Sequence, residues 1–299
     1  MLEAYRLGGS LYVPVTHKDC LSIANGCKWP ELRSVIFCTE DAVAAEALGP
    51  ALDNLRHCLD TMRPSTETLR FVRVRNPEIL TWLLALPGID KLDGFVFPKL
   101  DMRNIDAYMD RLGGRRSGYV CMPTLETRDV FEPARMAELR DYMLERGYQE
   151  RILALRIGGN DLLSILGIRR PRDRTLYRTP LGLTIANLVT VFKPHGFQLT
   201  APVFEHLDCP EILQEELGED LAHGLCGKTA IHPDQLPLID HRFRVSPSDL
   251  EVAQRILGEE RAVFKYGGSM CELATHSAWA KHIVVRAASE KHWHGTLTR

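Results

Sequence analysis

The sequence lacks the features that would assign it to several other classes of protein. None of its eight cysteines forms a Cys-x-x-Cys pair, so neither a zinc site nor a thioredoxin-like motif is indicated. It has no signal peptide and no apolar run of membrane-spanning length, and we expect a protein of the reduced cytoplasm with no membrane partner. No Gly-x-Gly-x-x-Gly or Walker-type loop follows a predicted strand. The net charge of −2 shows no basic excess, so no nucleic-acid partner is expected.

Short apolar runs instead alternate with amphipathic stretches along almost the whole chain. The apolar runs, bounded by Gly and Pro, are typical of buried parallel strands, and we predict strands at 9–14, 34–39, 70–75, 94–98, 118–122, 152–157, 198–201 and 224–229. Helical stretches between them include 42–62, 77–86, 104–112, 133–146 and 181–195. Eight strands alternating with helices favour an α/β fold of the (β/α)8 barrel type, and a doubly wound sheet is the alternative.

After the eighth predicted strand the pattern changes to helices. Residues 247–260 are predicted to form one helix, capped by Ser246 or Ser248. A second helix is expected at 274–288, followed by a polar tail at 289–299. The chain therefore ends in a helical appendage beyond the barrel.

A pair of glycines, Gly267 and Gly268, lies between the two predicted helices of this appendage. Because glycine is conformationally free, we expect the pair to act as a flexible hinge. We divide the chain into a barrel that carries a metal site, residues 1–245, and a C-terminal helical extension or lid with its tail, residues 246–299.

Two carboxylates follow successive predicted strands. Glu126 comes directly after the run 117–125, and Asp161 comes after the run 152–160. The carboxyl ends of parallel strands form the face where such proteins place their chemistry. Two carboxylates there suit Mg²⁺, which typically binds one or two protein carboxylates and leaves its other positions to water and substrate. The alternative is an N-cap or salt bridge at each strand–helix junction, but the pair together favours the metal.

The strand ends carry six short motifs in order, namely Thr-Glu-Asp-Ala-Val at 39–43, Val-Arg-Val-Arg-Asn-Pro at 72–77, Val-Phe-Pro-Lys at 96–99, Leu-Glu-Thr at 125–127, Gly-Gly-Asn-Asp-Leu at 158–162 and Gly-Lys-Thr-Ala-Ile-His-Pro-Asp-Gln at 227–235. This ordered set resembles the citrate lyase beta-subunit-like branch of the HpcH/HpaI aldolase/citrate lyase family, which includes malyl-CoA and citramalyl-CoA lyases. The resemblance covers nearly the whole chain and is that of a divergent member. It implies a modified (β/α)8 TIM barrel that binds Mg²⁺ or Mn²⁺ and cleaves or forms a carbon–carbon bond next to a carbonyl.

Compared position by position, the resemblance assigns Glu126 and Asp161 as metal ligands. Arg73 matches the arginine that binds the substrate's carboxylate or carbonyl. Arg75 competes for this role, because the family usually reads Val-Arg-Val-Asn where this chain has an extra Arg before Asn76. A period-2 step along a strand is expected to put both arginines on one face. A surface ion pair is the alternative for each arginine. The resemblance gives Asp41, with its neighbour Glu40, a role in orienting a water molecule or the arginine, and a helix N-cap at Asp41 is the alternative.

The chemistry of such a cleavage needs an electrophilic site. Breaking the bond leaves an enolate, whose negative oxygen a divalent metal and hydrogen-bond donors would stabilise. Backbone N–H groups of Gly159, Asn160 and Asp161 are candidate substrate-binding donors, since glycines let the chain approach a ligand closely. Lys99 and Lys228 are predicted to pack and to form networks rather than to react.

Glu272 lies farthest along the sequence from the other candidate site residues. It occupies the position at which relatives have the acid of a Gly-Lys-Met-Ile-Asp segment. In acyl-CoA lyases of the family this acid comes from the C-terminal appendage of a neighbouring subunit. Glu272 is therefore a candidate acid–base residue, and a homo-oligomer, trimer or hexamer, is expected. The alternative is a solvated Glu at the start of a helix.

The expected function is that of a Mg²⁺-dependent lyase that performs retro-Claisen or retro-aldol cleavage of a 3-hydroxy acid or its CoA thioester. Its partner would be a small-molecule carboxylate or acyl-CoA. Residues 201–205 and the basic run 169–174 depart from the family's pattern, and this weakens the case for thioester recognition. The basic run is a solvated loop or a rim that binds an anionic ligand. The alternatives are a pyruvate- or oxaloacetate-dependent aldolase that uses free acids without CoA, and a catalytically silent barrel subunit of a larger assembly.

Overall fold

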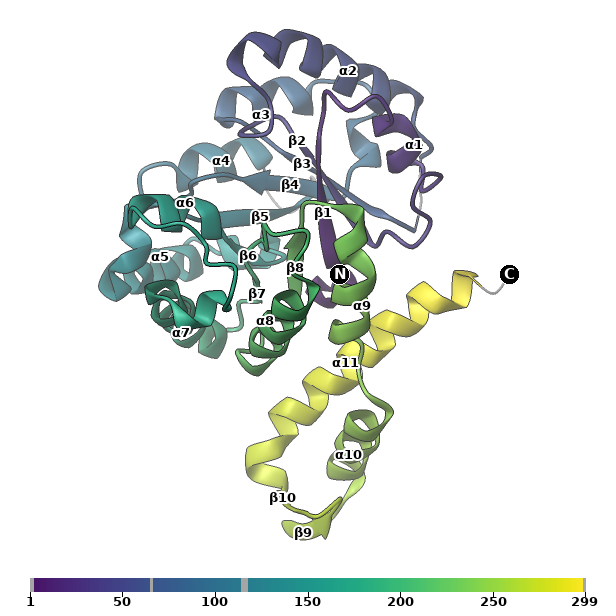
Figure 1. The fold of residues 1–299 in the computed structure, drawn as a ribbon, viewed down its shortest axis with the longest axis vertical. Coiled ribbons are helices and arrows are strands. Elements are labelled where there is room, and N and C mark those ends of the chain that lie inside the picture. Colours follow the sequence, from purple (N-terminus) through teal and green to yellow (C-terminus); the bar gives the residue numbers. More distant parts are fainter. Residues whose placement is uncertain (1–2, 65–66, 114–117, 298–299) are drawn as a thin grey trace.

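Eight parallel strands form the centre of the molecule. The computed structural model describes residues 3–64, 67–113 and 118–297, and its sheet runs in the order β7-β6-β5-β4-β3-β2-β1-β8. The two ends of this sheet meet, because a parallel bridge joins Ala201 to Lys228 and the N–H of Ala201 donates to the carbonyl of Gly227 at 2.8 Å. The sheet therefore closes into a barrel surrounded by helices (Figure 1).

Each strand overlaps one of those predicted from the sequence. They are β1 (Gly8–Pro14), β2 (Ser34–Cys38), β3 (Leu69–Arg73), β4 (Gly94–Phe97), β5 (Val120–Leu125), β6 (Leu155–Ile157), β7 (Leu199–Thr200) and β8 (Gly227–Ala230). Their residues are apolar at consecutive positions because the barrel interior buries one face and the helices bury the other. The (β/α)8 barrel is confirmed, and the doubly wound alternative is wrong.

The helices around the barrel are α1 (Cys20–Ala24), α2 (Leu48–Thr61), α3 (Pro77–Leu84), α4 (Ile105–Leu112), α5 (Pro133–Glu145), α6 (Gly159–Ile165), α7 (Pro180–Phe192), α8 (Pro210–Ala222) and α9 (Leu236–Phe243). The five helical stretches named from the sequence correspond to α2, α3, α4, α5 and α7. No helix within the described ranges combines the length and the apolar character needed to cross a bilayer.

The C-terminal residues form a separate projection below the barrel. Its elements are α10 (Pro247–Gly258), β9 (Val263–Tyr266), β10 (Ser269–Glu272) and α11 (Leu273–Leu297). The predicted cap of the first helix is confirmed at Ser246, whose Oγ accepts from the N–H of Asp249 at 2.9 Å. The projection has its own small apolar core, made by Ala253, Ile256, Phe264, Cys271, Ala280 and Ile283.

Two expectations about this appendage need correction. Gly267 and Gly268 have φ values of +56° and +81° and form the turn between β9 and β10, so the pair is a hairpin turn and not a hinge. A two-residue hairpin turn requires positive φ at both positions, which glycine adopts without strain. The predicted end of the second helix at residue 288 is also wrong, because α11 continues through the polar tail to Leu297.

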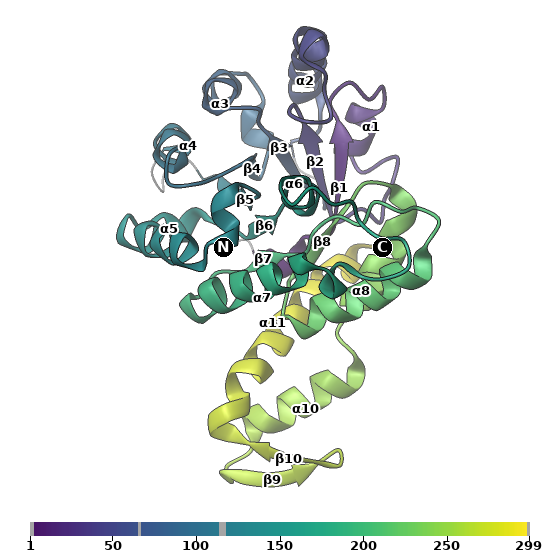
Figure 2. The same cartoon turned by 60° about the vertical axis from the view of Figure 1, so that its left-hand side comes forward.

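The appendage is attached at the amino-terminal end of the barrel. Arg286 on α11 donates through Nη2 to the carbonyl of Phe243 at 2.7 Å, and its guanidinium lies 5.9 Å from the centre of the Tyr5 ring, just before β1. The N–H of Val245 donates to Oε1 of Glu290 at 2.9 Å. In both views the β9–β10 hairpin lies at the end of the appendage away from the barrel (Figures 1 and 2).

A buried ionic cluster ties the outer face of β8 to α8. Lys228 is 1% exposed, and its Nζ lies 2.9 Å from both Glu216 Oε1 and Asp220 Oδ2. Arg170 donates to the other oxygen of Glu216 at 2.6 Å, and the Tyr177 hydroxyl donates to Asp220 at 2.7 Å. Lys228 is thus a network residue, as predicted. The basic run 169–174 is not uniformly a solvated loop, because Arg170 is buried within this cluster.

Replacing Lys228 by Met should destabilise the fold strongly. The change leaves two buried carboxylates with one cation fewer, and removing one partner of a buried ionic group costs about 3–5 kcal/mol. Urea unfolding followed by circular dichroism would measure the loss, with Lys18→Met at an exposed position as the matched control. An unfolding midpoint equal to that of the control would contradict a stabilising role for the cluster.

Candidate active site

A cavity of about 300 Å³ lies at the carboxyl ends of the barrel strands. Most of the site residues predicted from the sequence line it together, namely Asp41, Arg73, Glu126, Gly159, Asn160 and Asp161. They come from the ends of β2, β3 and β5 and from the start of α6, which follows β6. Barrel closure brings these segments together, and this face is where barrels of this kind carry their chemistry.

Arg73 is the centre of an ion network in this cavity. Its Nη2 lies 2.9 Å from Glu126 Oε1, 2.9 Å from Glu40 Oε2 and 3.3 Å from Asp41 Oδ2. All three ion pairs use the same guanidinium nitrogen, whereas Nε of Arg73 is buried without a partner among the described residues. Burial lowers the pKa of Arg73, but the nearby Tyr12 and the carboxylates of Glu126 and Glu40 together outweigh it, so that the pKa is raised. Arg73 therefore stays charged and keeps donor capacity on the rest of its fork.

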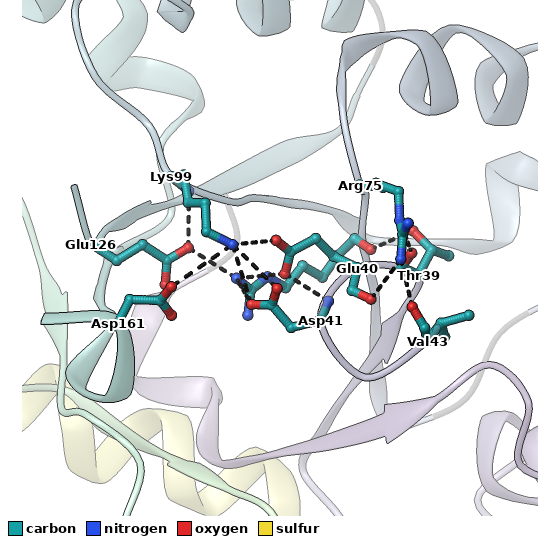
Figure 3. A network of polar contacts seen from close by, with 9 residues as sticks. Thr39, Glu40, Asp41, Val43, Arg75, Lys99, Glu126 and Asp161 are labelled. Atoms are coloured by element: carbon teal, nitrogen blue, oxygen red, sulfur yellow. Dashed lines mark hydrogen bonds and ion pairs between the residues drawn. The ribbon is translucent and has the colours of Figure 1, made fainter. Parts of the chain in front are cut away.

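Lys99 is the second cation of the network and bridges its two halves. Its Nζ lies 2.5 Å from Glu40 Oε1, 3.2 Å from Asp41 Oδ1 and 3.8 Å from Asp161 Oδ1. Its backbone N–H also donates to Glu126 Oε1 at 2.9 Å. Figure 3 shows Lys99 between Glu126 and Asp161 on one side and the Glu40–Asp41 pair on the other. Lys99 is a network residue, as expected from the sequence.

The backbone at Lys99 is held in an unusual conformation. With φ of 49°, it is the one non-glycine residue with positive φ in the described part of the chain. Its carbonyl accepts from Nδ2 of Asn104 at 2.9 Å. A non-glycine residue in this region costs about 1–3 kcal/mol, and such strain is concentrated at functional sites. Here it directs both the N–H and the ammonium group of Lys99 toward carboxylates.

Glu126 is the most deeply buried carboxylate of the cavity, with 3% of its surface exposed. Burial, together with the negative charge of Asp161, raises its pKa to about 7, although the Arg73 charge acts in the opposite direction. A further cation beside Glu126 and Asp161 would therefore be stabilised. No group of three or more His, Cys, Asp or Glu residues with metal-site geometry occurs in the described ranges. A metal at this position would have two protein carboxylates and would complete its shell with water and ligand, the pattern typical of Mg²⁺.

The adjacent pair Glu40 and Asp41 differs in acidity. Burial raises the pKa of Glu40. Burial acts on Asp41 in the same direction, but its hydrogen bond with Glu40 and the charges of Arg73 and Lys99 outweigh this and lower its pKa. Neighbouring carboxyl groups whose pKa values move apart are typical of sites that hold and transfer protons.

Arg75 does not line the cavity. Its Nε donates to the carbonyl of Thr39 at 3.1 Å, and its Nη2 donates to the carbonyls of Glu40 at 3.2 Å and Val43 at 2.5 Å. Figure 3 shows Arg75 with Thr39 and Val43 on the side away from Glu126 and Asp161. The expectation that Arg73 and Arg75 share one face is wrong, because β3 ends at Arg73 and the strand pleat does not continue past it.

Glu272 lies at the end of β10, outside the cavity of its own chain. Its Oε2 accepts from the Thr275 hydroxyl at 3.2 Å, and its N–H donates to Nδ1 of His276 at 3.0 Å. The appendage that carries Glu272 projects from the opposite end of the barrel (Figure 2), so Glu272 does not contribute to the cavity of its own chain.

Several polar residues that line the cavity were not predicted from the sequence. They are Tyr12, Thr124, Arg156 and Thr229. A signal was present for Arg156, because an arginine within the apolar run Leu155-Arg156-Ile157 is unusual at a buried position. The hydroxyl-bearing residues carried no such signal, since Thr and Tyr are common in strands for packing reasons alone.

Comparison with known proteins identifies the family of this chain. The family model described as C–C bond lyase of the TIM-barrel fold matches residues 1–290. The chain belongs to this lyase family. The resemblance to citrate lyase-like proteins seen in the sequence is confirmed, and membership places the chain among enzymes that act on carbon–carbon bonds.

Individual members of the wider group are only distantly similar. A (3S)-malyl-CoA thioesterase of Cereibacter sphaeroides is 26% identical over 269 residues, which cover 89% of this chain and 87% of the relative. CitE of Mycobacterium tuberculosis, solved in complex with magnesium, acetoacetate and coenzyme A, is 22% identical with a TM-score of 0.67 and is aligned over 95% of this chain and 99% of that chain. RipC of Yersinia pestis is 19% identical with a TM-score of 0.60, over 83% and 100% of the two chains. The two structural likenesses support the barrel fold.

The position of Glu126 depends on a glycine at residue 158. A Cβ added there would overlap Oε2 and Cβ of Glu126 and lie 2.9 Å from its Cδ. Gly158→Ala should therefore displace Glu126 and destabilise the protein by about 1–3 kcal/mol, as for other overpacked buried positions. Urea unfolding would measure this.

The matched control is Gly49→Ala in α2, where an added Cβ meets nothing within 4 Å. Alanine is a better helix former than glycine, so this control should be neutral or stabilising. Equal midpoints for the two variants would show that residue 158 has room for a side chain.

Proposed function

We propose that this protein is a Mg²⁺-dependent carbon–carbon lyase that cleaves, or in reverse forms, a 3-hydroxy acid or its CoA thioester and so releases or consumes a 2-oxo acid or an acetyl unit. The observation that carries the proposal is the convergence of Glu126 and Asp161 on one cavity beside Arg73. Similar solved proteins support it, since CitE of Mycobacterium tuberculosis was solved with magnesium together with acetoacetate, and in another structure with pyruvate.

Magnesium would be held by Glu126 and Asp161, and manganese suits the same oxygen ligands. When bound there, the ion supplies a Lewis acid for the oxygen on which negative charge develops as the carbon–carbon bond breaks. The residues present fit such an ion. Burial raises the pKa of Glu126 to about 7, so a cation beside its carboxylate would stabilise the charged form.

Arg73 would bind the carboxylate or carbonyl of the substrate. Its Nη2 is occupied by three carboxylates, but its buried Nε has no described partner. A guanidinium can donate several bonds in one plane, which suits a carboxylate better than a point charge does. Backbone N–H groups of Gly159, Asn160 and Asp161, in the first turn of α6, have no acceptor within the helix and would bind further ligand oxygens.

Asp41 and Glu272 are the candidates for proton transfer to the enolate. Asp41 lines the cavity, and its backbone N–H donates to Oε2 of Glu40 at 2.8 Å, which holds the two carboxyl groups beside each other. Burial raises the pKa of Glu40, so this neighbouring carboxyl group is the one that would hold a proton close to the ligand. Glu272 would serve a neighbouring chain, and this requires a homo-oligomer, for which a trimer or a hexamer is our expectation. Sedimentation of the full-length chain would test the assembly.

Two alternative functions remain open to test. An aldolase that uses free 2-oxo acids without CoA gains some support from the basic run, because Arg170 is buried against Glu216 and only the exposed Arg169, Arg172 and Arg174 are left to contact a CoA phosphate. A catalytically silent barrel subunit would hold an ion without turnover. Incubation with (3S)-malyl-CoA, or with pyruvate and an aldehyde, each with and without Mg²⁺, separates the three functions by which mixture reacts.

Removing either proposed metal ligand should abolish both binding and turnover. Glu126→Gln and Asp161→Asn keep the side-chain shape but remove a negative charge, and the metal-dependent rate should fall by roughly 100-fold or more. Calorimetric titration with Mg²⁺ and Mn²⁺ gives the binding, and product assay gives the rate. Glu132→Gln, at an exposed position, is the matched control. Unchanged titrations in both ligand variants would refute the metal site.

Arg73→Lys should weaken catalysis more than Arg75→Lys. Lysine keeps the charge but loses the fork, and a hydrogen bond to a charged group contributes about 2 kcal/mol, or roughly 30-fold in kcat/KM. Arg75→Lys affects only the carbonyls of the loop at 39–43, so its effect should be smaller. Steady-state kinetics of both variants decide the matter, and a larger loss for Arg75→Lys would show that the wrong arginine has been assigned.

A further inference from the structure

Arg156 is a buried cation that the proposed reaction does not yet use. It lies on β6, with only 2% of its surface exposed, yet it lines the cavity. In the register of the barrel it stands between Thr124 on β5 and Thr200 on β7. A charged side chain at this depth of a barrel is unusual unless it is paired.

The guanidinium of Arg156 has few partners. Its Nη2 donates to Oγ1 of Thr229 at 2.6 Å, its Nη1 lies 3.7 Å from the sulfur of Met122, and its carbon lies 5.4 Å from the centre of the Tyr12 ring. It makes no ion pair with any residue in the described ranges. Because a guanidinium has five N–H donors, at least three are without a protein acceptor there.

The lack of a described ion pair distinguishes Arg156 from Arg73, which lines the same cavity. Arg73 makes ion pairs with three carboxylates, whereas the polar and aromatic partners of the Arg156 guanidinium among the described residues are a hydroxyl, a thioether and an aromatic face. Burying a cation without a counter-charge is costly, and the cost is removed when an anion binds beside it. An anion bound beside Arg156 would remove this cost.

A second polar group beside Arg156 is also without a partner. Thr124 is 3% exposed and lines the cavity, and its Oγ1 has no hydrogen-bond partner among the described residues. Buried hydroxyl groups are mostly hydrogen-bonded in native proteins. Thr127, Thr175 and Thr200 also have hydroxyls without a described partner, but they do not line the cavity, so among these threonines Thr124 is the one that a ligand atom in the cavity can reach. Thr124, Arg156 and Thr229 thus present two hydroxyls and a guanidinium on one wall.

We infer that Arg156 binds a second anionic group of the substrate, a carboxylate on the part of the molecule that becomes the 2-oxo acid. This inference rests on the proposed function, in which the first carboxylate or carbonyl lies near Glu126, Asp161 and Arg73. The guanidinium carbons of Arg73 and Arg156 lie 5.8 Å and 5.4 Å from the centre of the same Tyr12 ring. One small molecule within a cavity of about 300 Å³ can therefore contact both arginines. Arg156 is then the residue that selects dicarboxylates over monocarboxylates.

Pyruvate and oxaloacetate form a matched pair of probes, because they differ by one carboxylate on the methyl carbon. With Mg²⁺ present, calorimetry on the full-length chain should show oxaloacetate binding about tenfold or more tightly than pyruvate, as expected for one charge-assisted, bidentate contact. In Arg156→Met, which keeps the length of the side chain without its charge, this ratio should fall to about one. Arg156→Lys should give an intermediate ratio, and Arg63→Met, at an exposed position, should keep the ratio of the wild type.

Stability without ligand provides an independent readout. If Arg156 serves a ligand, Arg156→Met should unfold at the same urea concentration as the wild type or a higher one, because an uncompensated buried charge has been removed. A clearly lower midpoint would show that Arg156 is a structural support and would overturn the inference. Should Arg156→Met fail to fold, the ratio in Arg156→Lys decides, and a ratio equal to that of the wild type overturns the inference.

The outcomes separate this inference from the function on which it rests. If neither probe binds the wild type with Mg²⁺, the proposed function fails. If both bind with equal affinity, or if Arg156→Met weakens both by the same factor, the proposed function stands and the role of Arg156 as a selecting residue is refuted.

Discussion

The site depends on two cations that hold four carboxylates together. Glu40, Asp41, Glu126 and Asp161 would repel one another at such short range if Arg73 and Lys99 did not lie between them. Barrel closure brings the strand ends together, but only this alternation of charge allows them to stay close in a partly buried place. The strained backbone of Lys99 is part of the same arrangement, because it directs two donors of one residue at the acidic groups.

Two ionic clusters of the barrel differ in how completely they are paired. Around Lys228 every charged side chain has an ion-pair partner and none is exposed, although Nε of Arg170 has no hydrogen-bond partner among the described residues. Inside the cavity the ion pairing is incomplete, since Arg156 makes no ion pair with a described residue. Incomplete pairing beside a cavity is what distinguishes a binding site from a structural cluster.

The pattern of the sequence was sufficient for the barrel, because consecutive apolar residues bounded by turns are typical of strands buried on both faces. It was also sufficient to predict that Arg73, Glu126 and Asp161 lie close together, because the carboxyl ends of parallel strands share one face of the barrel. The three residues do line one cavity. The sequence was insufficient to predict the local structure where one short pattern is compatible with two conformations. Gly267-Gly268 fits a hinge as well as a hairpin turn, and only the pairing of β9 with β10 distinguishes them. The length of α11 was missed because polar residues at a chain end resemble a solvated tail.

The sequence by itself determined the fold class, the lyase family and the order of acidic residues along the strand ends, since these follow from periodicity and from short motifs. Only the tertiary structure decided the partners of each side chain. Arg73 and Arg75 are separated by two positions, yet one lies in the cavity and the other binds loop carbonyls, because β3 ends between them. In the sequence Arg156 is a single charged residue within an apolar strand. That it has no described counter-charge follows only from the positions of the neighbouring strands. Pairing of charges depends on distances across the barrel, which the order of residues does not contain.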